Sequence, residues 1–129
     1  MKWQLSIATK FRAFHVLDER EEKHEHMWRV RVAVKGEPIH GRVVSLPLLR
    51  EQLLPEIEKL DGRYLNTDGS LDIATRENPT CENLALYFAE QLSQKLANHR
   101  ETAHLRLSYI DVAVDEINGE ETGAVRLTL

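Results

Sequence analysis

Three of the six histidines in this chain lie within residues 14–28, around a run of acidic and basic side chains. His24 and His26 are separated by one residue. On a β-strand, such a pair projects from one face with about 6.5–7 Å between the two positions, so both rings could reach one ion. His15 could supply a third nitrogen from a neighbouring strand. Three imidazoles with an open fourth position are typical of catalytic zinc, whereas structural zinc sites are closed and rich in cysteine. The alternative is a charged surface that binds no metal, and the spacing alone leaves both interpretations open.

The elements that must position these histidines are two strands. Residues 3–15 alternate between apolar and polar side chains, which predicts a long half-buried strand with His15 on its apolar side at the end. Residues 16–23 are acidic and aperiodic, which indicates a loop. A second strand is predicted over residues 24–35, and one of its faces carries His24, His26, Trp28, Val30, Val32 and Val34.

The middle of the chain predicts two helices. Apolar residues recur at three- and four-residue intervals over residues 46–60, with Ser45 as N-cap and Pro47 in the first turn. Pro55 lies inside this stripe and lacks an N–H, so we expect a kink or a break there. Residues 61–78 are rich in turn formers and are predicted as loop. The second helix begins after Thr80 as N-cap, and its stripe consists of Leu84, Phe88, Leu92 and Leu96.

The end of the chain returns to alternation. A strand is predicted over residues 105–116, with a bulge near Ser108 or Tyr109 where the apolar parity shifts. Asn118, Gly119 and Gly123 then predict a turn before a short strand at residues 124–129. The order of two strands, two helices and two strands indicates an α+β fold, a four-stranded antiparallel sheet with both helices on one face. Because such a sheet has two unpaired edges, we expect a homo-oligomer.

The composition limits the class of protein. A chain of 129 residues with 42% hydrophobic and 29% charged residues fits one globular domain, residues 1–129. The net charge of −4 argues against nucleic-acid or anionic-membrane partners. Cys81 is the only cysteine, which excludes an intramolecular disulfide. No apolar run approaches the roughly 20 residues of a membrane span, so we expect a soluble, cytoplasmic protein.

Several motifs occur in an order that resembles the 6-pyruvoyltetrahydropterin synthase family, which includes the 6-carboxytetrahydropterin synthases of queuosine biosynthesis. The similar segments are F-R-A-F-H at 11–15, H-E-H at 24–26, G-R-V-V at 41–44, L-D-G-R-Y-L-N at 60–66 and P-T-C-E-N-L-A at 79–85. The likeness covers nearly the whole chain, and several ordered motifs are more specific than any single one.

The resemblance implies a T-fold that assembles into barrel-forming trimers or hexamers with sites at subunit interfaces. It also implies Zn²⁺ on His15, His24 and His26. The implied activity is that of a zinc-dependent lyase acting on the side chain of 7,8-dihydroneopterin triphosphate or a related dihydropterin. In this chemistry the metal polarises side-chain oxygens, and a general base moves the proton.

The departures from the family concern that base. The catalytic cysteine expected shortly before the histidine pair is absent, and Gly62 replaces the histidine that follows Asp61. One branch of the family has a glutamate near the cysteine position and cleaves dihydroneopterin-type side chains toward 6-hydroxymethyl-dihydropterin. Glu21 matches that spacing and is the candidate base, although it could instead belong to a solvated loop. Asp61 could orient a base or cap a turn.

The resemblance also implies a glutamate that anchors the pterin ring through two hydrogen bonds. Glu116 fits that position, and a shorter alignment would place Tyr109 there. Thr80 is a candidate pterin contact as well as an N-cap. Besides a lyase, the sequence leaves open a non-catalytic protein that binds zinc and pterin, and a structural oligomer whose histidines bind nothing.

Overall fold

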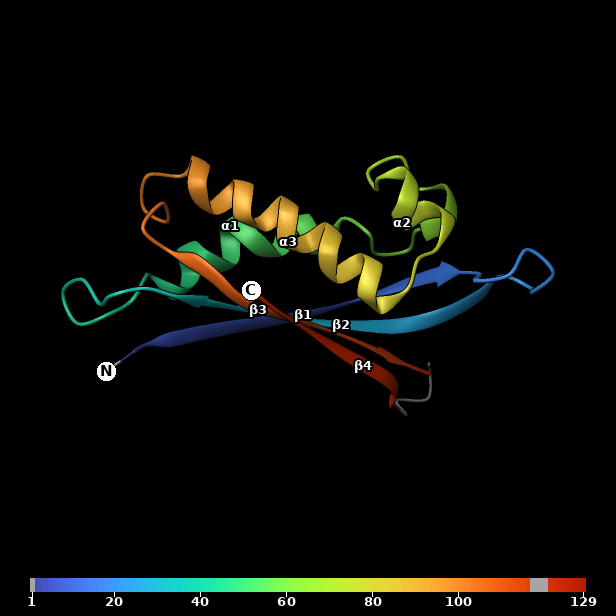
Figure 1. Ribbon diagram of the computed structural model, residues 1–129, viewed down its shortest axis with the longest axis horizontal. Helices are drawn as coiled ribbons and strands as arrows, with labels where there is room; N and C mark the ends of the chain where they lie inside the picture. Colours follow the sequence, from blue (N-terminus) through green and yellow to red (C-terminus); the bar gives the residue numbers. More distant parts are fainter. Residues whose placement is uncertain (1, 117–120) are drawn as a thin grey trace.

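The computed structural model describes residues 2–116 and 121–129 and shows helices layered on one antiparallel sheet (Figure 1). The four strands lie in the order β1-β2-β3-β4, so each strand pairs with its neighbour in the sequence. The strands are β1 (Gln4–His15), β2 (His24–Lys35), β3 (Arg106–Asp115) and β4 (Glu121–Thr128). The predicted fold class is thereby confirmed.

The register of β1 against β2 places the histidines together. His15 faces His24 at one end of this pair, and Gln4 faces Lys35 at the other. Phe11, on the same side of β1 as His15, is buried against the helices, and so is Trp28 on β2. The alternation of the sequence therefore predicted the correct face of both strands.

The expected bulge in β3 is confirmed. Tyr109 faces Ala33, whereas Leu107 faces Val34, so Ser108 is the additional residue and the apolar parity shifts there. β4 begins earlier than the predicted residue 124, and Gly123 lies inside it opposite Val114 rather than in a turn. The predicted turn at residues 118 and 119 lies outside the described residues.

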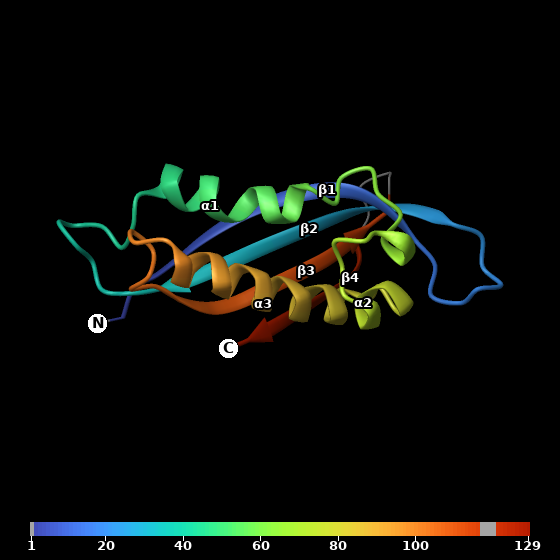
Figure 2. The same ribbon diagram turned by 90° about the horizontal axis from the view of Figure 1, so that it is seen from above.

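Two long helices cover the sheet, α1 (Leu46–Glu58) and α3 (Cys81–Asn98). They lie side by side in the view from above (Figure 2). Of the two alternatives expected at Pro55, the break is wrong, because α1 continues through it to Glu58, and the kink stays a prediction. Pro55 lies in the last turn, where its missing N–H removes a single hydrogen bond near the helix end. Ser45 is the N-cap, but its side chain makes no capping hydrogen bond.

The sequence predicted residues 61–78 as loop, and this prediction is only partly correct. They contain a 3₁₀ helix, η1 (Leu65–Thr67), and a short helix, α2 (Ile73–Glu77). Elements of three and five residues are too short to produce a helical pattern of apolar residues. α2 and the first turns of α3 lie over the end of the sheet at which β1 ends and β2 begins (Figure 2).

The core lies between the helices and one face of the sheet. Its largest fully buried side chains include Trp28, Phe11 and Phe88. No helix of the described residues covers the other face (Figure 1), and side chains there form ion pairs such as Arg126 with Asp111. None of the helices in the described part of the chain has the length and apolar character that crossing a bilayer requires.

Candidate metal centre

The three predicted histidines come together at one end of the sheet. One ring nitrogen from each of His15, His24 and His26 lies within 4.8 Å of the other two. The ring centroids are 4.6 Å apart for His15 and His24, 4.7 Å for His24 and His26, and 5.0 Å for His15 and His26. This convergence is what a single ion bound by three imidazoles requires.

Hydrogen bonds determine which nitrogen of two of these rings is available to a metal. Nδ1 of His15 lies 3.0 Å from the carbonyl oxygen of Pro79, and Nδ1 of His24 lies 3.2 Å from that of Glu22. A carbonyl can only accept, so Nδ1 carries the proton in both rings and Nε2 keeps its lone pair. Metal-binding histidines typically hold their second nitrogen in this way. Nδ1 of His26 is buried and has no hydrogen-bond partner in the described part of the chain.

The surroundings keep two of the rings uncharged. Burial lowers the pKa of His15, with a smaller effect from His24 and His26, while the Pro79 carbonyl opposes the shift. Burial also lowers the pKa of His26, again helped by His24 and opposed by Glu116 and the Asp115 backbone. Because only the neutral imidazole binds metal, both shifts favour binding near neutral pH. The donor set fits Zn²⁺, since Mg²⁺ and Ca²⁺ require oxygen ligands.

The histidines open into a pocket of about 430 Å³. Thr80, at the start of α3, lies in its wall, and its hydroxyl accepts a hydrogen bond from the Asn83 backbone, as predicted for an N-cap. Most of the wall is apolar. The lining residues are His15, Leu17, His24, His26, Trp28, Thr80, Cys81, Glu82, Val114, Gly123, Ala124 and Val125.

Two candidate carboxylates lie beside the histidines. Oε2 of Glu21 is 4.0 Å from Nδ1 of His24, and Oε1 of Glu116 is 3.9 Å from Nδ1 of His26. Glu21 belongs to the loop between β1 and β2. The ammonium group of Lys23, in the same loop, lies 4.9 Å from the centroid of the Phe14 ring. This cation–π contact attaches the loop to β1.

Asp61 and Tyr109 are not in this group. Oδ1 of Asp61 accepts a hydrogen bond of 2.9 Å from the backbone N–H of Arg12, which ties the segment after α1 to β1. Tyr109 lies six residues before Asp115 on β3, which separates it from the histidine end of the strand by about 20 Å. Its ring packs under the guanidinium group of Arg126. Within one chain, Glu116 is therefore the nearer candidate for binding a ligand in the pocket.

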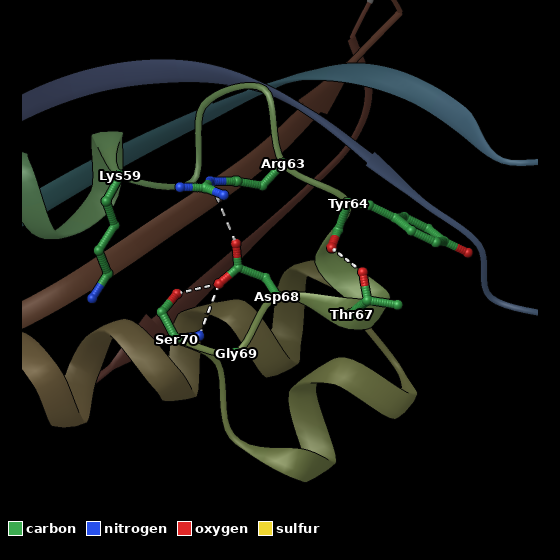
Figure 3. A pocket seen from close by; sticks show the side chains of 7 residues that line it. All are labelled: Lys59, Arg63, Tyr64, Thr67, Asp68, Gly69 and Ser70. Atoms are coloured by element: carbon green, nitrogen blue, oxygen red, sulfur yellow. Dashed lines mark hydrogen bonds and ion pairs between the residues drawn. The ribbon is translucent and has the colours of Figure 1, made fainter.

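Another pocket of about 430 Å³ lies beside the segment that contains Asp61 (Figure 3). Several of its polar groups bind one another: Asp68 accepts hydrogen bonds from the backbone N–H and the hydroxyl of Ser70, and its carboxylate lies 3.8 Å from the guanidinium group of Arg63. The Tyr64 ring points away from them. This second pocket is lined by Lys59, Arg63, Tyr64, Thr67, Asp68, Gly69 and Ser70, which include no histidine or cysteine.

Sequence reasoning did not assign Leu17, Cys81 or Val125 to the pocket. Leu17 and Val125 carry no chemical signal and reach it only through the packing of segments far apart in the chain. Burial raises the pKa of the Cys81 thiol to about 11, and the charge of Glu82 adds to the shift. Cys81 is therefore protonated at neutral pH and does not replace the missing nucleophile.

Comparisons with known proteins show similarity in sequence and in fold. The family model of 6-pyruvoyl tetrahydropterin synthase matches residues 4–121. The chain is 32% identical over 98 residues to the dihydroneopterin monophosphate aldolase of Pyrococcus furiosus, which covers 74% of this chain and 80% of that protein.

Solved structures of the same class have a similar fold. The 6-pyruvoyl tetrahydropterin synthase of Caenorhabditis elegans superimposes with a TM-score of 0.73 and 20% identity over 100% of this chain and 96% of that chain. The enzyme of Plasmodium vivax, solved as an alanine variant of a catalytic glutamate, gives a TM-score of 0.68 with 15% identity over 100% and 99%.

Proposed function

This chain belongs to the 6-pyruvoyl tetrahydropterin synthase family, and from that premise we propose that it is a zinc-dependent lyase that cleaves the side chain of a dihydropterin. One observation carries the proposal: three histidines converge at the mouth of a largely apolar pocket, and carboxylates stand beside them. His15, His24 and His26 would hold the metal. Bound there, zinc would polarise the oxygens of the substrate side chain as a Lewis acid.

The reaction that we favour is aldol-type cleavage of a dihydroneopterin or its phosphate ester toward 6-hydroxymethyl-dihydropterin. Its support is the Pyrococcus furiosus relative, which is named an aldolase of dihydroneopterin monophosphate. The absence of a cysteine before the histidine pair is consistent with this choice. Conversion of 7,8-dihydroneopterin triphosphate, as in a 6-pyruvoyl- or 6-carboxytetrahydropterin synthase, is the second candidate.

Glu21 is the proposed general base. Its carboxylate stands on the loop beside His24 and would take the proton from the side-chain hydroxyl whose carbon becomes an aldehyde. As that C–O bond becomes C=O, the neighbouring carbon–carbon bond breaks. The electron pair of the broken bond stays on the side-chain carbon that is attached to the pterin ring, and this carbon then gains a proton. A glutamate is also named as a catalytic residue of the Plasmodium vivax enzyme, so this fold accommodates a catalytic glutamate.

Binding of the pterin ring is assigned to Glu116 and Thr80. A carboxylate suits the ring because its two oxygens can accept from the amino and N3 hydrogens together. Asp61, bonded to the backbone of β1, would contribute only if a second copy brought it to the pocket. The proposed homo-oligomer, a trimer or hexamer with sites at subunit interfaces, would allow this and would also pair the edges of β1 and β4.

The test is incubation of the purified protein with 7,8-dihydroneopterin, its monophosphate and its triphosphate, with zinc or with a chelator, followed by chromatography of the fluorescent oxidised products. We expect zinc-dependent formation of the 6-hydroxymethyl product. Glu21→Gln should lower kcat by about 10²–10⁴-fold. The matched control is Glu19→Gln, an exposed acid in the same loop, which should retain the parent rate.

Each outcome separates the candidates. A product with a 6-pyruvoyl or a 6-carboxy group would favour the synthase reaction instead. Binding of zinc and pterin without turnover would favour the non-catalytic protein, for which the missing cysteine and Gly62 are the motivation. A fully active Glu21→Gln variant would remove Glu21 from the role of base and leave the lyase proposal standing.

A further inference from the structure

We propose that the carboxylate of Glu116 accepts the Nδ1–H of His26 and thereby positions this ring to bind metal. Of the three histidines, only His26 lacks a hydrogen bond from its outer nitrogen to any of the described residues; His15 and His24 each donate to a backbone carbonyl. A buried N–H without an acceptor is unfavourable, and in metal sites it usually finds a carboxylate, a carbonyl or a water molecule.

Glu116 is placed to be that acceptor by the sheet. Met27 on β2 pairs with Asp115 at the end of β3, so Glu116 emerges next to His26. Its Oε1 stands 3.9 Å from Nδ1, and closing the gap to a hydrogen bond of about 2.8 Å needs a movement of roughly 1 Å. The Glu116 side chain is 47% exposed and is free to make that movement, whereas that of His26 is 11% exposed and held in place.

The competing acceptor is the backbone of Asp115. Its polar contact with the His26 ring favours the charged form of that ring, but the contact does not reach the distance and angle of a full hydrogen bond with Nδ1. A carboxylate is the stronger partner, because a charged acceptor roughly doubles the strength of a hydrogen bond. It also makes the ring a better metal ligand, as the carboxylate–histidine–zinc arrangement does elsewhere.

One carboxylate can serve the metal site and the ligand together. If one oxygen of Glu116 holds His26, the other remains available to the hydrogens of a pterin ring. This second part rests on the proposed function. It implies that metal and pterin bind cooperatively, each raising the affinity of the protein for the other by the same factor.

The test of the positioning role measures zinc affinity on the substrate-free protein by competition with a chromogenic chelator. We expect Glu116→Ala to weaken zinc binding by about 10–100-fold. Glu116→Gln should lose less, because its amide oxygen can still accept from Nδ1. The matched control is Glu25→Gln. Glu25 precedes His26 in the chain, but its carboxylate pairs with Arg12, so the zinc affinity of this variant should stay within about twofold of the parent.

A spectroscopic readout separates positioning from a general structural effect. Cobalt substituted for zinc should give an altered visible spectrum in Glu116→Ala and the parent spectrum in Glu25→Gln. Equal zinc affinity for the parent and Glu116→Ala would overturn the proposal and assign the ring to the Asp115 backbone or to water. Because no substrate is present, lack of lyase activity would leave this result unaffected.

Discussion

His24→Ala and His15→Ala should both abolish metal binding, but only His15→Ala should destabilise the metal-free protein. His24 contributes a side chain that is 39% exposed, at the start of β2. His15 is 5% exposed and donates a hydrogen bond to Pro79, at the junction between α2 and α3. Comparison of the two variants therefore separates metal binding from the packing of the fold.

The expected sizes follow from burial. Zinc at about one hundred times its dissociation constant should add about 2.7 kcal/mol to the unfolding free energy of the parent. For a chain of this length that is a rise in Tm of roughly 10 °C. The metal-free His24→Ala variant should match the metal-free parent within about 0.5 kcal/mol. Metal-free His15→Ala should lose about 2–4 kcal/mol, because it leaves a cavity and an unpaired carbonyl.

The assay is thermal and urea unfolding of the parent and both variants, with zinc and with a chelator. Neither variant should gain stability from zinc. If zinc raised the Tm of His24→Ala as much as that of the parent, the three-histidine site would be refuted. If metal-free His15→Ala were as stable as the parent, the structural role of the Pro79 contact would be refuted.

Two further predictions concern titration and thiol chemistry. Because the pKa values of His15 and His26 are lowered in the folded state, the unfolded chain binds protons more readily below about pH 6.5. The unfolding free energy of the metal-free protein, measured in urea, should therefore fall from pH 7.5 to 5.5. The fall should be smaller in the double variant His15→Asn, His26→Asn. Burial raises the pKa of Cys81 to about 11, so its alkylation by iodoacetamide at pH 8 should be roughly two hundred times slower than that of free cysteine. Reaction at the rate of free cysteine would contradict this burial.

Local patterns predicted most of the fold. The two-residue period of β1 and β2 placed His15, His24 and His26 on one face, because successive side chains of a strand alternate between its faces. The parity shift near Ser108 predicted the bulge, and Thr80 predicted the start of α3. The same patterns missed η1 and α2, which are too short to carry a period, and overestimated the effect of Pro55 near the end of α1.

The sequence by itself determined the residue types and the face from which each one projects, and its ordered motifs indicated the family. Only the tertiary structure decided which groups meet. Pro79, 64 residues from His15, selects the ring nitrogen that remains available to a metal, and the end of β3 brings Glu116 beside His26. The tertiary structure also places the carboxylate of Asp61 against the backbone of β1, away from the histidines. The physical reason is that periodicity depends on neighbours within a few residues, whereas these contacts depend on how distant segments pack across the sheet.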